Sequence, residues 1–402
     1  MPGLNTQEIA TARDVLPDLP PQLVDDLLRA FPQSTAPIRQ LATLLHEQPL
    51  REPAFDDFGS ALRELAAVSL EDPRADFTED TEGELVPQAD PLMLFEDTTS
   101  VCGEFADALQ DVRDSSGEKR KPERHEFPRP GVTAEAPSTA GTLHEFHAAG
   151  PRPAHPLSPR LTQPGTVAKA GPTGDQRLAQ DWNKLWLGAH ELLRQVVYHV
   201  LRRRAGLVGQ LGLGPCVRGL ASAAGNLRIH LVGHGLGGRL AGFTLRGLEH
   251  SGEPSPSVQS LTLLQAAISH FAFASSLPHQ VSGHGALWDR QRLVRGAVVT
   301  CFSDADISLG LMHPLATQMV GDAAELSTVG RKWGAAGFDG LHGVDGPPAL
   351  RLNDVLADGL PSASFVNIDA GSVVRDGPVP TGAHHDVLHP EVARLLLHHI
   401  PR

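Results

Sequence analysis

Four of the six residues 233–238 are glycine, and this run lies between an apolar stretch and a helical pattern. The stretch before it, residues 226–232, alternates apolar and polar side chains and then becomes apolar, which predicts a strand. The stretch after it, residues 239–248, has its large apolar side chains at helical spacing. A turn so rich in glycine lets the backbone approach other groups closely, so it restricts the chain to folds built on a strand–turn–helix unit.

The rest of the C-terminal half continues this alternation. Helical patterns occupy residues 182–204, which precede a set of spaced glycines, and residues 390–400, while strand patterns occupy residues 258–264, 296–302 and 365–368. Strands that alternate with helices are typical of a mainly parallel sheet flanked by helices. We therefore expect an α/β domain over residues 179–402, and we expect the glycines after residue 204 to end the first helix.

The N-terminal part of the chain differs in composition. Apolar residues at helical spacing predict a helical segment within residues 1–70. Residues 71–114 carry fourteen Asp or Glu and two Arg, and residues 115–177 hold ten of the 33 prolines with few large apolar side chains. Such segments bury too little surface to offset the entropy of ordering them. We expect residues 71–178 to form a largely disordered linker or insertion.

Charge and cysteine content exclude several classes of protein. With 47 acidic against 34 basic residues the net charge is −13, which argues against a nucleic-acid partner. Three widely spaced cysteines do not make a disulfide framework or a cysteine-rich zinc site, and they favour a cytoplasmic location. We expect Cys216 and Cys301 to be small buried residues and not nucleophiles. The sequence has no apolar run long enough for a transmembrane segment.

The glycine turn allows a dinucleotide-binding interpretation. Gly233, Gly235 and Gly238 satisfy G-x-G-x-x-G after a strand and before a helix, where a pyrophosphate could approach the helix N-terminus. This interpretation requires an acidic residue for the ribose near the end of the next strand, but residues 263–266 read Leu-Leu-Gln-Ala. The motif also lies past the middle of the chain. Dinucleotide binding is therefore a lesser alternative.

A nucleophile elbow, G-x-S-x-G, explains the turn better. Residues 233–237 read Gly-His-Gly-Leu-Gly, which matches the elbow except that Gly235 occupies the serine position. Gly233 and Gly237 are expected to allow the close packing of the elbow, and glycine tolerates the strained torsion angles of the nucleophile position. A serine-to-glycine replacement therefore keeps the turn and removes the attacking oxygen. A glycine-rich turn without chemistry is the remaining interpretation.

The residues that follow the turn fit the order nucleophile, acid, histidine of α/β-hydrolases. Asp304 and Asp306 come directly after the predicted strand 296–302, and either could orient an imidazole. His384 and His385 come just before the closing helix, and either could act as general base. Each of these residues alone is typical of a solvated loop, but their order after the elbow favours a remnant of a catalytic triad.

From about residue 182 to its C-terminus the chain resembles a bacterial family of α/β-hydrolase-fold proteins, uncharacterised esterase- or lipase-like hydrolases. The resemblance covers a little over half of the chain. It is carried by the glycine turn and by residues 204–209, 260–274, 300–306, 333–340 and 382–384. It implies an α/β-hydrolase-like sheet with Asp306 as the acid, His384 as the base and Gly235 at the vacated nucleophile position.

The chain departs from this family in two further ways. The oxyanion hole of such hydrolases needs two N–H groups, one from the residue after the nucleophile and one from an early loop often marked His-Gly. Leu236 could supply the first, but we find no His-Gly pair before residue 226 for the second. We also find no clear strand before residue 226, although such hydrolases build several strands there. We therefore expect an incomplete N-terminal half of the sheet.

These observations predict an esterase-like ancestry with weak or absent hydrolysis, because the nucleophile of covalent catalysis is missing. A water activated by His384 beside Gly235 would give slow direct hydrolysis of a small ester-like substrate. A non-catalytic pseudoenzyme that binds a ligand or a partner protein is the alternative. Neither interpretation implies a cofactor.

A metal-dependent hydrolase is a lesser alternative. His384, His385, Asp386 and His389 form the string H-H-D-x-x-H, and catalytic zinc sites use three protein ligands. This spacing matches no established signature, so we expect no metal site. The other histidines of the C-terminal half are expected to be core or surface residues. They are His234, His270, His284 and His342.

Overall fold

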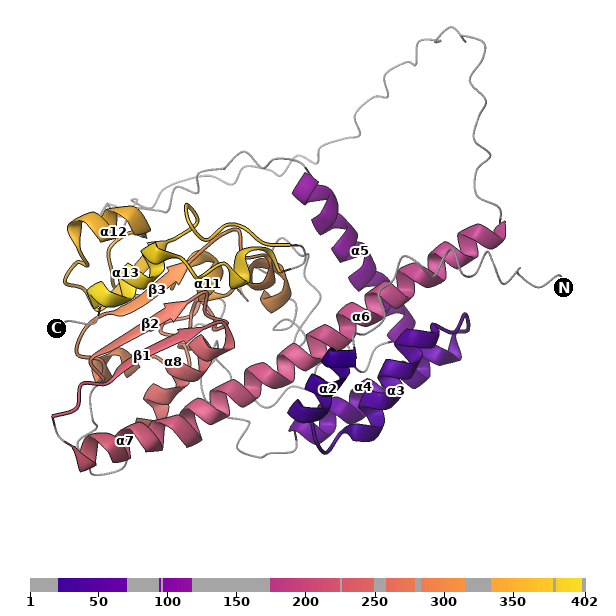
Figure 1. The fold of residues 1–402 in the computed structure, drawn as a ribbon, viewed down its shortest axis with the longest axis horizontal. Helices are drawn as coiled ribbons and strands as arrows, with labels where there is room; N and C mark the ends of the chain where they lie inside the picture. Colours follow the sequence, from indigo (N-terminus) through magenta and orange to yellow (C-terminus); the bar gives the residue numbers. More distant parts are fainter. Residues whose placement is uncertain are drawn as a thin grey trace, which may run out of the picture.

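The structure is a computed structural model that describes residues 21–70, 94, 97–117, 174–224, 226–248, 258–278, 283–314, 334–378 and 381–399. A group of N-terminal helices and a C-terminal sheet with its helices form two parts of the molecule (Figure 1). The long helix α6 (Gly174–Leu207) runs from one part to the other. Residues 1–20 and 71–93, which belong to the predicted helical segment and linker, lie outside the described residues.

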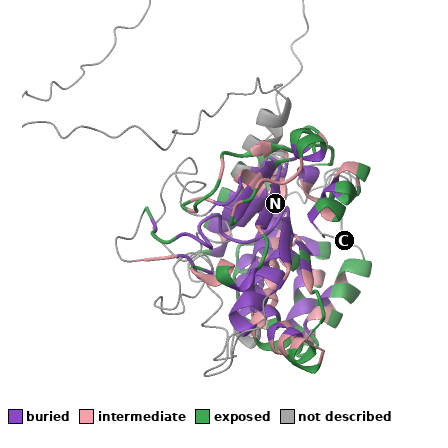
Figure 2. Ribbon diagram, turned by 90° about the vertical axis from the view of Figure 1, so that its left-hand side faces the viewer, coloured by how far each residue is buried: buried purple, intermediate pink, exposed green. Residues whose placement is uncertain are grey.

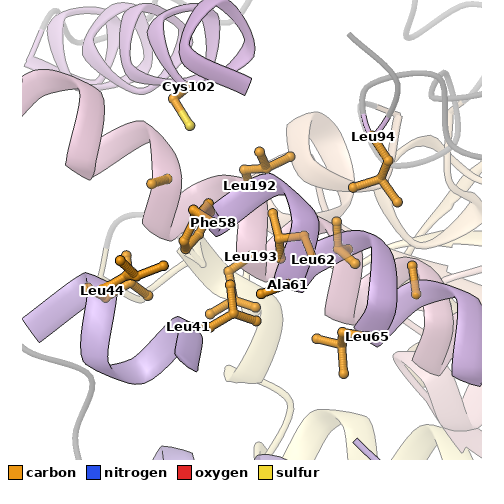
Figure 3. Close-up of a cluster of buried hydrophobic side chains, with 14 of the residues drawn as sticks. Leu41, Leu44, Phe58, Ala61, Leu62, Leu65, Leu94, Cys102, Leu192 and Leu193 are labelled. Atoms are coloured by element: carbon orange, nitrogen blue, oxygen red, sulfur yellow. The ribbon is translucent and has the colours of Figure 1, made fainter. Parts of the chain in front are cut away.

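The N-terminal part is a bundle of helices, as predicted for residues up to 70. It consists of α2 (Pro21–Ala30), α3 (Thr35–Glu47) and α4 (Pro53–Leu70), packed on α6 between Trp182 and Leu201. Apolar side chains spaced three and four residues apart on α3 and α4 point into one shared core (Figure 3). At its centre Trp186 of α6 is fully buried and its ring lies 4.5 Å from that of Phe55.

One helix contradicts the predicted linker. Residues Thr98–Gly117 form α5, which packs along α6 within the segment expected to be disordered. Its buried face carries Val101, Cys102 and Phe105, so a narrow apolar stripe is sufficient despite the surrounding acids. A boundary at residue 178 is also wrong, because α6 begins at Gly174 and contributes to both parts. Residues 118–173 lie outside the described residues.

The C-terminal part contains a five-stranded sheet in which every strand pair is parallel, which confirms the α/β prediction. The strand order is β1-β2-β3-β5-β4. The strands are β1 (His230–His234), β2 (Ser260–Leu264), β3 (Val298–Phe302), β4 (Leu350–Arg351) and β5 (Phe365–Asp369). Among the described residues no strand precedes β1, which lies at the edge of the sheet.

Helices cover both faces of this sheet (Figure 2). On one face, alternate strand residues such as Leu261 and Leu263 pack against α8 (Leu236–Leu248). On the other face, Leu264 and Val299 pack against α12 (Leu352–Asp358) and α13 (Pro390–His399). Because side chains alternate along a strand, strands with apolar residues on both faces are buried between two helical layers.

The glycines after residue 204 do not end the helical structure, contrary to expectation. Helix α6 continues to Leu207, passes through a π-helical turn, η3 (Val208–Leu213), and leads into α7 (Gly214–Ala223). A Cβ atom at Gly209 would collide with the carbonyl oxygen of Leu240, and one at Gly214 would lie 2.6 Å from Cα of Gly247. These glycines therefore allow the segment to pack closely on α8.

Helix α13 carries a buried histidine that makes stability depend on pH. Nδ1 of His399 lies 2.7 Å from the Oγ1 atom of Thr262 in β2, and the imidazole is buried beneath the sheet. Burial lowers the pKa of His399 to about 4. The folded protein therefore holds this ring neutral at pH values where an exposed histidine, with a pKa near 6.5, takes up a proton.

We expect the free energy of unfolding contributed by His399 to fall by about 2 kcal/mol between pH 7 and pH 5, because the unfolded chain then binds the proton that the folded chain excludes. The loss should begin near pH 6.5 and be complete near pH 4. Urea denaturation at pH 7 and pH 5 measures it. His399→Gln should show a smaller pH dependence than the wild type, while His398→Gln, which changes an exposed neighbour, should not.

Candidate functional site

The glycine turn joins β1 to α8 at the carboxyl edge of the sheet. Gly235 has a φ of +56°, in the left-handed region that favours glycine. Its N–H donates to the carbonyl oxygens of Leu264 and Gln265, each at 3.1 Å. Its carbonyl oxygen accepts from the N–H groups of Gly238 at 3.0 Å and Ala267 at 2.9 Å. Both backbone polar groups of Gly235 are therefore held by neighbouring elements.

Two neighbouring glycines are needed for close packing, and one is not. A Cβ atom at Gly233 would lie 2.7 Å from Cα of Gly238, and one at Gly238 would collide with Ala266 of the adjacent segment. A Cβ atom at Gly237 would meet nothing within 4 Å. The expectation that Gly237 serves close packing is therefore wrong, because α8 turns this position toward solvent, and Gly238 has that role.

The structure brings Asp306 and His384 together although 78 residues separate them. Asp306 follows β3, is fully buried and accepts at Oδ1 from the N–H of Leu309 at 3.0 Å. Its Oδ2 lies 2.7 Å from Nδ1 of His384. A proton on Nδ1 leaves Nε2 of the neutral ring free to accept one, which is the state required of a general base.

The Nε2 atom of His384 faces Gly235. A Cβ atom built on Gly235 would lie 2.9 Å from Nε2 and 3.3 Å from Cε1 of this ring. Carboxylate, imidazole and position 235 therefore follow one another as acid, base and nucleophile do in a catalytic triad. The ring fills part of the space that a serine side chain would occupy, so less room for an activated water remains beside Gly235 than the sequence suggested.

Backbone contacts hold the acid and histidine loops together. His384 lies in η6 (Gly382–His385), where the N–H of Ala383 donates to the carbonyl oxygen of Ala305 at 3.0 Å. Gly382 has a φ of +57°, and a Cβ atom there would lie 2.7 Å from the backbone N of Ile307. Glycine at position 382 is therefore what allows the two loops to meet.

The structure also separates the alternatives that the sequence left open. Asp304 and His385 are exposed, while Asp306 and His384 form the contact. Leu236 is the first residue of α8, and its N–H belongs to the helix end that lacks intrahelical acceptors. It directly follows position 235, the place from which a nucleophile elbow supplies one oxyanion donor. No strand before β1 carries a loop with a second donor in the described part of the chain.

Two further residues of this region were not expected to have a role here: His234 was expected to be a core or surface residue, and Gln265 had no expected role. Nε2 of His234 donates to the backbone carbonyl oxygen of His384 at 2.7 Å, so His234 positions the histidine loop, and burial lowers its pKa. Gln265 is fully buried with a φ of +38°, and its carboxamide has no hydrogen-bond partner among the described residues. The sequence signal that could have pointed to Gln265 is its position directly after the predicted strand 258–264.

The H-H-D-x-x-H string does not converge on a metal site. His384 points to Asp306, and His385 is exposed. Asp386 accepts from the backbone N–H groups of Arg375 and Asp376 at 2.9 Å each, so its carboxylate closes a loop. In the described residues a different set of potential ligands is clustered, formed by His270, Asp339 and His342.

No cysteine competes as a nucleophile at this site. Cys301 lies within β3, as expected, and burial raises the pKa of its thiol to about 12. Its thiolate is therefore scarce at neutral pH. Cys216 is exposed, contrary to expectation, because α7 presents it on its outer side.

The dinucleotide interpretation is not favoured by this geometry. The ring of His384 lies against Gly235, where the backbone would have to admit a pyrophosphate. His234 and His384 stand 4.9 Å apart between ring centroids and cover this side of the turn.

Comparison with known proteins gave no match, whether to a family model, to a curated protein or to a solved structure. Among the helices in the described ranges, none combines the length and the apolar composition that a membrane span needs. Arguments about function therefore depend on the site.

Proposed function

We propose that this chain is an α/β-hydrolase-like protein, esterase-like in ancestry, whose nucleophile position is vacated by Gly235. The observation that carries the proposal is the alignment of Asp306, His384 and position 235, with 2.7 Å between acid and base and 2.9 Å between base and a Cβ at position 235. The acid follows β3 and the histidine follows β5, in the chain order of that fold.

The retained groups are suited to one half of serine-hydrolase chemistry. His384 can accept a proton at Nε2, Asp306 holds the ring and stabilises its charged form, and the N–H of Leu236 can stabilise an oxyanion. What is missing is the oxygen that attacks the acyl carbon. Hydrolysis of an ester is therefore limited to direct attack by water and is expected to be slow or absent.

A non-catalytic role is the second candidate, and one observation favours it. Because the His384 ring occupies part of the space beside Gly235, a water has little room between base and substrate. A ligand or partner protein could still bind at the carboxyl edge of the sheet, in the manner of a pseudoenzyme. No cofactor is part of either candidate.

Turnover of an activated ester by the wild type and by His384→Ala tests this proposal. We expect the two rates to differ by less than about tenfold, because the base has no serine to activate. A fluorophosphonate probe should not label the wild type. Rapid wild-type turnover that His384→Ala abolishes, or covalent labelling of a serine elsewhere, would contradict the vacated site.

A further inference from the structure

A second group of chemically active side chains lies outside the vacated triad. Nδ1 of His270 lies 3.1 Å from Oδ2 of Asp339, and Nε2 of His342 lies 3.5 Å from the same oxygen. The three potential ligand atoms all lie within 4.8 Å of one another. From these contacts we infer that His270, Asp339 and His342 form a binding site for a divalent transition-metal ion such as Zn²⁺.

The distances fit such an ion. Zinc–nitrogen and zinc–oxygen bonds of about 2.0–2.2 Å place neighbouring ligand atoms of a tetrahedral site about 3.3 Å apart. The two nitrogen–oxygen distances to Asp339, 3.1 Å and 3.5 Å, lie on either side of this value. Two imidazoles and one carboxylate are a ligand set that suits zinc and leaves a coordination position open for water or an anionic ligand.

The backbone around the cluster is fixed before any ion binds. The N–H of His342 donates to the carbonyl oxygen of His270 at 2.7 Å, which joins the two loops. The side chain of Asn367 accepts from the N–H of Leu341 at 2.8 Å and donates to its carbonyl oxygen at 2.9 Å. These bonds hold the loop between Asp339 and His342, as partners of ligand residues do in metal sites.

The three side chains differ in burial, and this difference leaves the cluster accessible from solvent. His270 is 1% exposed, whereas Asp339 and His342 are about a third exposed, so an ion could enter from solvent. The rings of His270 and His342 stack with centroids 4.3 Å apart, so His342 must turn for its Nε2 to meet an ion shared with His270. Its exposed side leaves room for this rotation.

The cluster lies on the same edge of the sheet as the glycine turn. Ala267, whose N–H binds the carbonyl oxygen of Gly235 at 2.9 Å, is three residues from His270, so chain geometry places the two sites within about 16 Å of each other. The metal site does not depend on the proposed hydrolase ancestry, since none of its ligands belongs to the triad.

Titration of chelator-treated, tag-free protein with Co²⁺ and Zn²⁺ tests the inference. We expect one ion per chain, visible-region Co²⁺ absorption typical of low coordination number, and at least tenfold weaker binding in Asp339→Asn and His342→Gln. His389→Gln alters a histidine of similar exposure that pairs with Asp386, and it should bind metal as the wild type does.

Thermal unfolding gives a second measure of metal binding, and it is valid for a variant whose stability differs from that of the wild type. Zn²⁺ should raise the Tm of the wild type and of His389→Gln but not that of His342→Gln, and each variant is compared with its own metal-free form. Less than one ion per chain in the wild type, or binding lost in His389→Gln but retained in His342→Gln, would overturn the inference. The cluster would then be a hydrogen-bonded structural feature.

Discussion

Gly235→Ser is expected to create a serine hydrolase. Its hydroxyl would lie next to Nε2 of His384, whose Nδ1 is already held 2.7 Å from Asp306. Loss of a catalytic serine typically costs about 10⁶ in kcat, and absence of one oxyanion donor costs about 10²–10³. We therefore expect activated-ester hydrolysis about a thousandfold above the wild type, together with fluorophosphonate labelling at residue 235.

Gly235→Ala is the matched control. Both substitutions place a Cβ atom at a φ of +56° and 2.9 Å from Nε2 of His384, so both should destabilise the fold by about 1–2 kcal/mol. Only serine supplies a nucleophile. If Gly235→Ser folds as stably as Gly235→Ala but is neither labelled nor active, the site is not a triad lacking one group, and a binding role becomes the better proposal.

A second pair of variants should show that Gly233 and Gly237 have different packing roles in the turn. Gly233→Ala is expected to lower the free energy of unfolding by about 3 kcal/mol, because its Cβ atom would collide with the backbone of Gly237 and Gly238. These are backbone atoms of α8, so no side-chain rotation can relieve the contact. Chemical denaturation measures the loss.

Gly237→Ala tests the same turn, and here we expect the free energy of unfolding to increase. A Cβ atom there meets nothing within 4 Å, and position 237 lies in the first turn of α8. Alanine stabilises a helix more than glycine does, so we expect the free energy of unfolding of this variant to rise by about 0.5–1 kcal/mol. Equal losses from Gly233→Ala and Gly237→Ala would show that the turn packs differently from this structure.

The α/β class and much of the arrangement of Gly235, Asp306 and His384 could be predicted from the sequence, because both depend on local patterns. Apolar residues on both faces of β2 and β3 require helices on either side. The order of Gly235, Asp306 and His384 follows from the position of each residue after a strand. Parallel strands place such positions at one edge of a sheet, so their proximity is a consequence of topology.

Other features depend on contacts between distant segments. Helix α5 has too few apolar residues to be predicted, and the packing surface of α6 stabilises it. The choice of Asp306 over Asp304 and of His384 over His385 depends on how the loops pack at Gly382, where no side chain would fit. Neither the packing of α5 on α6 nor the packing of the two loops at Gly382 leaves a pattern among residues that are neighbours in the sequence.

By itself the sequence determined the parallel sheet, the glycine turn at Gly235 and the candidate acid and base, since hydrophobic period and glycine position act over a few residues. Only the tertiary structure decided that His384 fills the space beside Gly235, and that His270 meets Asp339 and His342. Such meetings depend on strand order and loop packing across 69 or more residues, where sequence spacing carries no information about distance.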